Sequence, residues 1–199
     1  MKIGVLALQG AVAEHIRLLT LAGAEAVAVK RTEQLDELDG LVIPGGESTA
    51  IGKLMKKYGF DTALREFAAK KKPLFGTCAG LIILAGDIEG QDWVHLGLMD
   101  IKVARNAFGR QRESFEVNLP IPGVAEDFRA VFIRAPLIRE VGDNVDILVR
   151  YKDEIVAARE GHLLCASFHP ELTDDARLHA YFLEMVKQYR MQEAVGTAQ

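Results

Sequence analysis

The sequence predicts an α/β fold in which helices flank a mostly parallel central sheet, with some antiparallel strands in the second half. Two observations support this prediction. In the first half, short apolar runs alternate with segments of helical periodicity, an order that produces a parallel sheet wrapped by helices. From Leu98 to Phe168 the runs become short and alternating and are split by Pro and Gly, which indicates strands joined by hairpins.

The composition excludes several classes of protein. The chain has 199 residues, of which 49% are hydrophobic and 26% charged, as in ordinary globular domains. Its net charge of −4 at pH 7 gives no global positive field for nucleic acid or anionic lipid. No apolar stretch approaches the roughly 20 residues of a membrane span, and the N-terminus shows no signal-peptide pattern. We expect a soluble, cytoplasmic protein with no nucleic-acid or membrane partner.

Four short, almost wholly apolar strands are expected in the first half: Lys2–Leu8, Glu25–Lys30, Leu41–Ile43 and Pro73–Gly76. The first helix follows from Val12, Ile16 and Leu19 at helical spacing, with Gly23 where a C-cap is expected. The remaining segments of helical pattern are Thr49–Tyr58, Asp61–Lys71 and one that continues through Leu81–Ala85.

The second half is expected to be mostly strand. Its alternating runs are Ile101–Ala104, Ser114–Asn118, Ala130–Arg134, Asp146–Arg150, Ile155–Arg159 and Leu163–Phe168. A final helix is expected over Asp174–Arg190, with Thr173 as its N-cap, followed by a frayed tail over residues 191–199. Because the sequence has no internal repeat and no Gly/Ser-rich linker, residues 1–190 are expected to form a single domain.

A candidate nucleophile lies between the strand Pro73–Gly76 and the helix after it. Residues 76–80, Gly-Thr-Cys-Ala-Gly, have the form Gly-x-nucleophile-x-Gly, in which flanking glycines prevent collisions around a strained central residue. Cys78 would also lie at a helix N-terminus, which favours thiolate over thiol. Cys165, in an apolar strand without such glycines, is interpreted as a packed core thiol. The spacing leaves a disulfide between the two cysteines open, although a reducing cytoplasm disfavours one.

A candidate base follows another predicted strand end, in the sequence His169-Pro170-Glu171. In extended backbone, residues i and i+2 project to the same side, so His169 and Glu171 can both face a neighbouring loop. A cysteine nucleophile needs a base, and the base needs a partner that fixes its tautomer. Taken singly, His169 is as well explained as a structural histidine, and Glu171 as a helix-start carboxylate. The histidines without such a setting are His15, His95, His162 and His179.

The loop Pro44–Ser48 follows the third strand and contains the pair Gly45-Gly46. Two glycines let the backbone approach a ligand closely, and an N–H there can face a developing oxyanion together with that of Ala79. By itself, Gly-Gly is more often only a turn. A phosphate-binding loop and a dinucleotide fingerprint are absent. No paired His or Cys spacing supports a zinc site, so we expect neither cofactor nor metal.

Several longer motifs together resemble class I (triad-type) glutamine amidotransferases, and most closely the family of glutaminase subunits of pyridoxal 5′-phosphate synthase. Besides residues 76–80 and His169–Glu171, these motifs are Gly4–Gly10, Pro44–Ser48, Ala104–Gly109 and Phe132–Pro136. The Leu-Gln-Gly, Pro-Gly-Gly-Glu-Ser and Phe-Ile-Arg-Ala-Pro segments are the most specific. The resemblance spans nearly the whole chain and implies the three-layer, flavodoxin-like fold of those enzymes.

The resemblance implies that Cys78 is the nucleophile, His169 the general base and then acid, and Glu171 the residue that orients it. It implies a glutamine site formed by Gly46, Glu47, Ser48, Arg105, Ile133 and Arg134. It also implies a partner in a heteromeric complex, the synthase subunit that makes pyridoxal 5′-phosphate from a pentose phosphate, a triose phosphate and ammonia. Because the glutaminase domain uses the length of the chain, we expect the enzyme that consumes the ammonia to dock as a separate protein.

Two other functions fit part of the pattern. A different cysteine hydrolase, such as a γ-glutamyl peptidase, would use the same three residues without a partner that consumes ammonia. A non-catalytic regulatory module on the same fold would need none of them, and its Cys78→Ala variant would lose no turnover.

Overall fold

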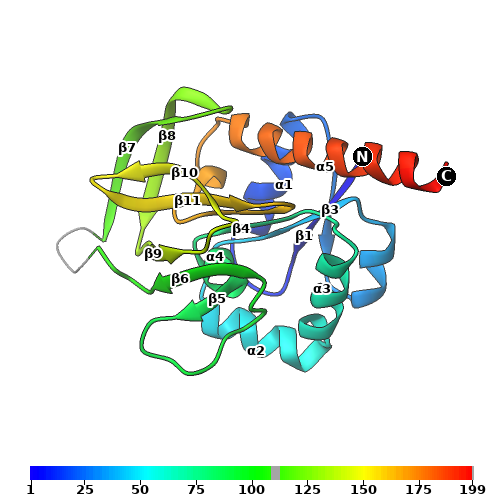
Figure 1. Cartoon of the computed structure of the whole chain (residues 1–199), viewed down its shortest axis with the longest axis horizontal. Helices are drawn as coiled ribbons and strands as arrows, with labels where there is room; N and C mark the ends of the chain where they lie inside the picture. The colour runs from blue at the N-terminus through cyan, green and yellow to red at the C-terminus, as the bar shows by residue number, and fades with distance from the viewer. Residues whose placement is uncertain (109–112, 199) are drawn as a thin grey trace.

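The computed structural model describes residues 1–108 and 113–198. Gly109, the last residue of the motif Ala104–Gly109, and Gln199, at the end of the predicted tail, lie outside the described residues. Within the described part of the chain, ten strands form one sheet, and helices pack on both of its faces (Figure 1). The predicted α/β architecture, a mostly parallel sheet between helices with antiparallel strands added in the second half, is confirmed.

The parallel part of the sheet uses strands from both ends of the sequence. In spatial order these are β2 (Glu25–Val29), β1 (Lys2–Leu6), β3 (Gly40–Ile43), β4 (Leu74–Thr77) and β12 (Leu163–Ala166). Every neighbouring pair in this series is parallel. The four strands expected in the first half are therefore present, close to their predicted bounds.

One face of the sheet is covered by α1 (Val12–Leu21) and α5 (Arg177–Thr197), and the other by α2 (Ser48–Tyr58), α3 (Phe60–Ala69) and α4 (Ala79–Leu84) (Figure 1). Strand β3 contributes to both cores. Leu41 and Ile43 pack in the core that contains the α2–α4 residues, whereas Val42 packs with Leu19 of α1 and Phe182 of α5. Alternate side chains of a strand point to opposite faces, and each such burial stabilises the fold by about 1.5–3 kcal/mol.

The sheet continues beyond β12 with mostly antiparallel pairing. In spatial order the added strands are β11 (Glu154–Glu160), β9 (Leu137–Val141), β6 (Met99–Ala104) and β5 (Ala85–Ile88), with β10 (Asp146–Tyr151) paired to β11. A separate hairpin is formed by β7 (Ser114–Ile121) and β8 (Ala125–Ile133) (Figure 1). Short 3-10 helices include η1 (Thr32–Glu37) and η3 (Pro170–Leu172).

Two strands of this region are not predicted by the sequence pattern. The six expected runs are all strands, but β5 and β9 are additional, and β5 pairs with β6 in parallel. β5 is four residues long and contains Gly86 and Asp87, which have low strand propensity. β9 carries Arg139 and Glu140 next to each other, so its apolar residues do not alternate. Both segments are strands because they pair with neighbouring strands, and not because their own sequence favours a strand.

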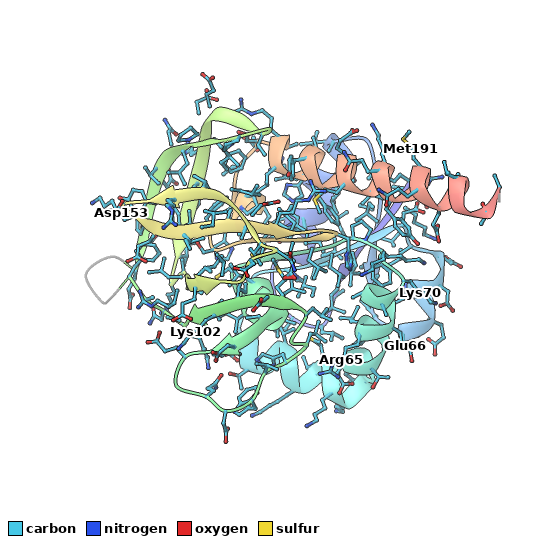
Figure 2. All side chains as sticks on the ribbon, viewed as in Figure 1. Arg65, Glu66, Lys70, Lys102, Asp153 and Met191 are labelled. Carbon is cyan, nitrogen blue, oxygen red and sulfur yellow. The ribbon has the colours of Figure 1, made fainter. Side chains whose placement is uncertain are left out.

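The last helix differs from its predicted bounds at both ends. It begins at Arg177 rather than Asp174, because two local hydrogen bonds hold the preceding residues in a turn. The hydroxyl of Thr173, the predicted N-cap, accepts a hydrogen bond from the N–H of Asp175, and the carboxylate of Asp175 accepts one from the N–H of Arg177. Residues 191–197, predicted to fray, are helical, although Met191 is 69% exposed (Figure 2). The segment starts with Met191, Gln192, Glu193 and Ala194. These residue types are strong helix formers, so they can continue a helix without packing against the rest of the fold. Among the described residues, no helix combines the length and the apolar character needed to cross a bilayer.

Candidate active site

Three segments that are distant in sequence meet at the carboxyl ends of adjacent parallel strands. In the pairing of β4 with β12, Thr77 lies opposite Ala166, so Cys78 and the segment after β12 leave the sheet next to each other. β3 pairs with the other side of β4, and the loop Pro44–Ser48 follows β3. This edge is where ligand sites of open α/β sheets form.

Cys78 occupies a strained turn between β4 and α4. Its φ of 51° lies in the left-handed region that residues other than glycine rarely adopt. A Cβ at Gly76 would collide with the backbone oxygen of Gly80, and a Cβ at Gly80 would collide with that of Ile43. Only glycine fits at the two flanking positions, which is the steric reason inferred from the sequence. Ala79 is the first residue of α4, so the helix leaves its N–H without an intrahelical partner.

His169 and Glu171 form a buried pair beside Cys78. His169 Nδ1 lies 2.6 Å from Glu171 Oε1, and Cys78 is close enough to the imidazole to affect its pKa. The backbone of Glu171 belongs to η3 rather than to the extended segment predicted, so a tight turn, and not strand alternation, brings the two side chains together. The N–H of His169 donates to Val131 O at 2.7 Å, which fixes the backbone before this turn.

The surroundings of His169 hold a proton on its imidazole. Burial alone would lower the pKa of His169, but the interactions of the imidazole with Cys78 and Glu171 outweigh burial and raise the pKa to about 10. The imidazole is therefore protonated at neutral pH. A protonated imidazole beside the sulfur stabilises a thiolate and can supply a proton to a leaving group.

The loop Pro44–Ser48 packs against the imidazole. A Cβ at Gly45 would lie 2.5 Å from His169 Cε1 and 2.8 Å from its Nδ1, so a glycine is required where the backbone contacts the ring. The same Cβ would lie 3.3 Å from Glu171 Oε1. The first glycine of the Gly-Gly pair is thus needed for contact with the histidine and its orienting carboxylate.

The other side of this loop is held by residues that follow β1. Gly45 O accepts a hydrogen bond from the N–H of Ala11 at 2.9 Å. Gln9 Oε1 accepts one from the N–H of Glu47 at 2.8 Å, and a Cβ at Gly46 would collide with this same oxygen. The Leu-Gln-Gly motif therefore positions the Pro-Gly-Gly-Glu-Ser motif, a relation that the sequence alone does not reveal.

Glu47 and Arg105, both expected at the glutamine site, lie close together at the start of α2. Glu47 is the N-cap of α2, and its carboxylate accepts hydrogen bonds from the N–H groups of Thr49 at 3.0 Å and Ala50 at 2.7 Å. Burial would raise the pKa of Glu47, but these N–H groups and the Arg105 guanidinium lower it. Arg105 Nη2 lies 3.7 Å from Glu47 Oε1, and both side chains are about half-exposed. The capping role of Glu47 is one that sequence reasoning did not assign.

The other residues expected at the glutamine site lie on two segments. Ser48 is the buried first residue of α2. Ile133 ends β8, and its carbonyl oxygen lies 3.8 Å from Cys78 Sγ, within hydrogen-bond reach of a thiol. Arg134 follows with a φ of 46°, and its N–H donates to Glu113 O at 2.7 Å, so its backbone is fixed while its side chain is exposed. The hairpin of β7 and β8 thus brings Ile133 close to the sulfur of Cys78, and Arg134 follows Ile133 in the chain.

Cys165 has none of these surroundings. It lies within β12, is fully buried, and burial raises the pKa of its thiol to about 12. Both cysteines are free, so the disulfide that the spacing left open is not formed. The interpretation of Cys165 as a core thiol is confirmed.

Two histidines that the sequence pattern leaves without a role are connected to Glu171: His15 lies next to it, and His179 contacts His15. His15 of α1 and His179 of α5 are fully buried, and His15 Nε2 is 3.5 Å from Glu171 Oε2. A weak signal was present, because His15 precedes Leu18 and Leu19 by three and four residues and so lies on the inner face of the predicted helix. A histidine buried there needs a polar partner.

The fold and the Cys78–His169–Glu171 geometry together define the class, a triad-type amidotransferase. The chain belongs to the SNO glutamine amidotransferase family, whose model matches residues 5–188. It is 66% identical over 190 residues to the pyridoxal 5′-phosphate synthase subunit PdxT of Niallia circulans, a match that covers 96% of this chain and 100% of that protein. It is 68% identical over 190 residues to the protein of the same name from Brevibacillus brevis, with the same coverage of 96% and 100%.

A solved structure supports the same conclusion. The crystal structure of a glutamine amidotransferase matches with a TM-score of 0.89 at 49% sequence identity, over 93% of this chain and 98% of the other. The family and the three-layer fold expected from the motifs are therefore confirmed.

Proposed function

We propose that this chain hydrolyses glutamine to glutamate and ammonia through Cys78, His169 and Glu171. The observation that carries the proposal is one imidazole that is hydrogen-bonded to a buried carboxylate and lies beside a strained cysteine. A regulatory module has no use for a strained turn or a buried charged pair, both of which destabilise a fold. The substrate class follows from the family, which is one of glutamine amidotransferases.

The first half of the reaction releases ammonia. The Cys78 thiolate attacks the side-chain amide carbon of glutamine, and the carbonyl oxygen becomes a tetrahedral oxyanion. The N–H of Ala79 and that of Gly45 or Gly46 donate hydrogen bonds to this oxygen, and each such donor contributes on the order of 100- to 1,000-fold in rate. His169 gives its proton to the amide nitrogen as the C–N bond breaks, which leaves a thioester on Cys78 and a neutral imidazole.

The second half restores the enzyme. His169 takes a proton from water while the resulting hydroxide attacks the thioester carbon. The C–S bond then breaks, glutamate leaves, and thiolate and imidazolium are regenerated. Throughout, Glu171 accepts the Nδ1–H of His169, so Nε2 remains directed toward the sulfur and the substrate.

We also propose how glutamine is recognised. The guanidinium groups of Arg105 and Arg134 suit the α-carboxylate, and the carboxylate of Glu47 suits the α-ammonium. In this proposal Gly46 and Ser48, at the start of α2, and Ile133, at the end of β8, complete the glutamine site.

The proposed partner is a pyridoxal 5′-phosphate synthase subunit that consumes the ammonia, because the relatives at 66% and 68% identity are named as subunits of that synthase. Ammonia released into water is protonated and lost, so docking of the consuming enzyme would protect it. The proposed glutaminase is the single domain of residues 1–190. A reducing cytoplasm, which keeps the nucleophilic thiol free, is its proposed location.

Ammonia release from glutamine, measured with and without the synthase subunit, tests this function. We expect hydrolysis that increases when the synthase subunit is present and that is lost in the Cys78→Ala variant. Equal hydrolysis of γ-glutamyl peptides, without any effect of the synthase subunit, would instead identify a peptidase. Unchanged behaviour of the Cys78→Ala variant would identify a non-catalytic module.

A further inference from the structure

The carboxylate that orients His169 has one oxygen without a hydrogen bond. Glu171 Oε1 accepts the Nδ1–H of His169 at 2.6 Å. Glu171 Oε2 is buried and has no hydrogen-bond partner among the described residues. A buried carboxylate oxygen without a donor is costly, because water no longer compensates its charge. The group nearest to this oxygen therefore matters for how Glu171 holds its charge and position.

That group is the imidazole of His15. Its Nε2 lies 3.5 Å from Glu171 Oε2 and 3.1 Å from the hydroxyl oxygen of Thr77, and the side chains of His15 and Glu171 are both fully buried. Thr77 is the residue immediately before Cys78. One ring nitrogen thus lies between the carboxylate that orients the base and the residue next to the nucleophile.

A second imidazole determines which nitrogen of His15 carries the proton. His179 Nε2 lies 2.9 Å from His15 Nδ1, and burial lowers the pKa of His15 well below its usual value and that of His179 to about 3. Both rings are therefore neutral, and each carries one N–H. Either His179 donates to His15, which places the N–H of His15 on Nε2, or His15 donates to His179 through Nδ1.

The first arrangement is the favourable one. It directs the Nε2–H of His15 toward Glu171 Oε2 and the hydroxyl oxygen of Thr77. In the second, the Thr77 hydroxyl could donate to Nε2, but the ring lone pair would still face the charged oxygen of Glu171. His179 Nδ1 is buried and has no partner among the described residues. In the first arrangement this atom carries only a lone pair, whereas in the second it would carry an N–H without an acceptor, and unpaired buried N–H groups are rare. The other charged groups nearby are His169, whose charge acts on His15, and Asp175, whose charge acts on His179.

We propose that His15 is a positioning residue of the triad, with its Nε2–H directed toward Glu171 Oε2 and its tautomer fixed by His179. The chain of contacts runs from Cys78 through His169, Glu171 and His15 to His179, and links the nucleophile to helices α1 and α5. His15 acts through Glu171 and touches neither the sulfur nor the substrate. This role rests on the proposed glutaminase function and deepens it.

Three variants test the role: His15→Leu, His15→Gln and, as a matched control, His162→Leu. Glutamine can place an N–H near the position of imidazole Nε2 and an oxygen where His179 can donate, whereas leucine can do neither. His162 is a partly buried histidine that contacts Ala68 O, away from the triad. Two readouts are used: kcat and KM for glutamine with the synthase subunit present, and the pH dependence of Cys78 alkylation by iodoacetamide. Alkylation is measured on the peptide that contains Cys78, so Cys165 does not interfere.

For His15→Leu we expect kcat to fall at least tenfold with KM changed less than twofold, in line with the loss found for outer partners of catalytic ligands. Without this donor Glu171 should keep its proton to a higher pH, and a protonated Glu171 no longer stabilises the imidazolium beside the sulfur. The pH at which Cys78 alkylation rises on the acid side should therefore increase by about one unit. His15→Gln should restore most of kcat and the wild-type acid limb, and His162→Leu should change neither. Equal losses in His15→Leu and His15→Gln, or wild-type values in a folded His15→Leu protein, would overturn the proposal.

Nitrogen-15 chemical shifts of the wild-type histidine rings give a test that needs no substitution. The proposal requires His15 to be the neutral Nε2–H tautomer, and a protonated Nδ1 would overturn it even if the leucine variant failed to fold. If the wild-type protein with its synthase subunit did not hydrolyse glutamine, the proposed function would fail. The alkylation profile and the tautomer would still decide the role of His15.

Discussion

The two cysteines of this chain belong to neighbouring segments of one sheet and have opposite surroundings. In the pairing of β12 with β4, Cys165 lies opposite Gly76, two residues before Cys78. Cys165 is fully buried within its strand, where burial raises the pKa of the thiol to about 12. Cys78 lies just beyond the end of β4, with a φ of 51° and beside a protonated imidazole.

Position along the strand, rather than residue type, therefore separates the two thiols. Within a parallel strand both faces are covered by helices, so a thiol meets only apolar atoms. At the carboxyl end the backbone turns, and helix N–H groups and loops from adjacent strands can surround the side chain. A displacement of a few residues changes a packing residue into a candidate nucleophile.

The largest effect should come from replacing each cysteine by alanine. Cys78→Ala should lower kcat for glutamine hydrolysis by at least about 10⁴-fold, as the loss of a triad nucleophile does in other hydrolases. Cys165→Ala should keep kcat within about twofold and lower the unfolding free energy by about 1 kcal/mol through a small cavity. Steady-state kinetics and urea unfolding measure the two quantities. Equal loss of activity in both variants would remove the distinction between the thiols.

The next largest effect is expected from Glu171→Gln. An amide keeps the shape of the carboxylate but removes the charge that stabilises the imidazolium, so kcat should fall by roughly 10³- to 10⁴-fold. Glu66→Gln, on the exposed surface of α3, is the control and should leave kcat unchanged (Figure 2). A Glu171→Gln enzyme within tenfold of the wild type would contradict the proposed role of the carboxylate.

A smaller effect is expected from Gly45→Ala. The added Cβ would lie 2.5 Å from His169 Cε1, so the ring or the loop must shift, and we expect kcat to fall on the order of 100-fold. Gly196→Ala is the matched control, since a Cβ there meets no atom within 4 Å. If both alanine variants showed wild-type kinetics, the close contact of the loop with the base would have no catalytic meaning.

The smallest effect is a pH dependence of stability. The pKa of His169 rises from 6.5 to about 10 in the folded chain, so its stabilising contribution is complete below pH 6.5 and is lost as the pH rises toward 10. Between pH 7.5 and 8.5 the unfolding free energy should therefore fall by about 1 kcal/mol. Cys165 contributes in the same direction only above the usual thiol pKa of 9.0, outside this range.

Urea unfolding at several pH values measures this effect. His15 and His179, whose pKa values are lowered, contribute almost fully from about pH 7.5 upward, because the imidazoles of the unfolded chain are then nearly all neutral as well. The His169→Asn variant should therefore show a nearly flat profile between pH 7.5 and 8.5. A wild-type profile that is flat, or that rises, over this range would mean that the imidazole is not protonated beside Cys78.

The sequence predicts the elements around the nucleophile well because they are locally encoded. The parallel strands are nearly continuous apolar runs, and Gly76 and Gly80 identify the turn by steric necessity. The edge strand β5 and strand β9 are not predicted, because Gly, Asp and adjacent charged residues carry no strand period and neighbouring strands define them. The helical segment 191–197 was missed because helix propensity, not a buried face, maintains it.

For the candidate site, the sequence predicts residue types better than their contacts. His169 and Glu171 meet as expected, but through the turn of η3 rather than an extended segment. The capping role of Glu47 is local, since its carboxylate accepts from residues two and three positions later, but Glu is not a preferred N-cap residue, so the pattern did not reveal it. The contacts of His15 with Glu171 and Thr77 depend on how α1 packs against β4 and η3, and no local period or spacing encodes such long-range contacts.

The most direct test of the difference between the two thiols is mass spectrometry after treatment with an electrophilic glutamine analogue. We expect one covalent adduct, on the peptide that contains Cys78, and none on Cys165 while the chain is folded. Excess glutamine should protect Cys78 from the label. An adduct on Cys165, or no adduct on a folded chain with its synthase subunit, would contradict the account.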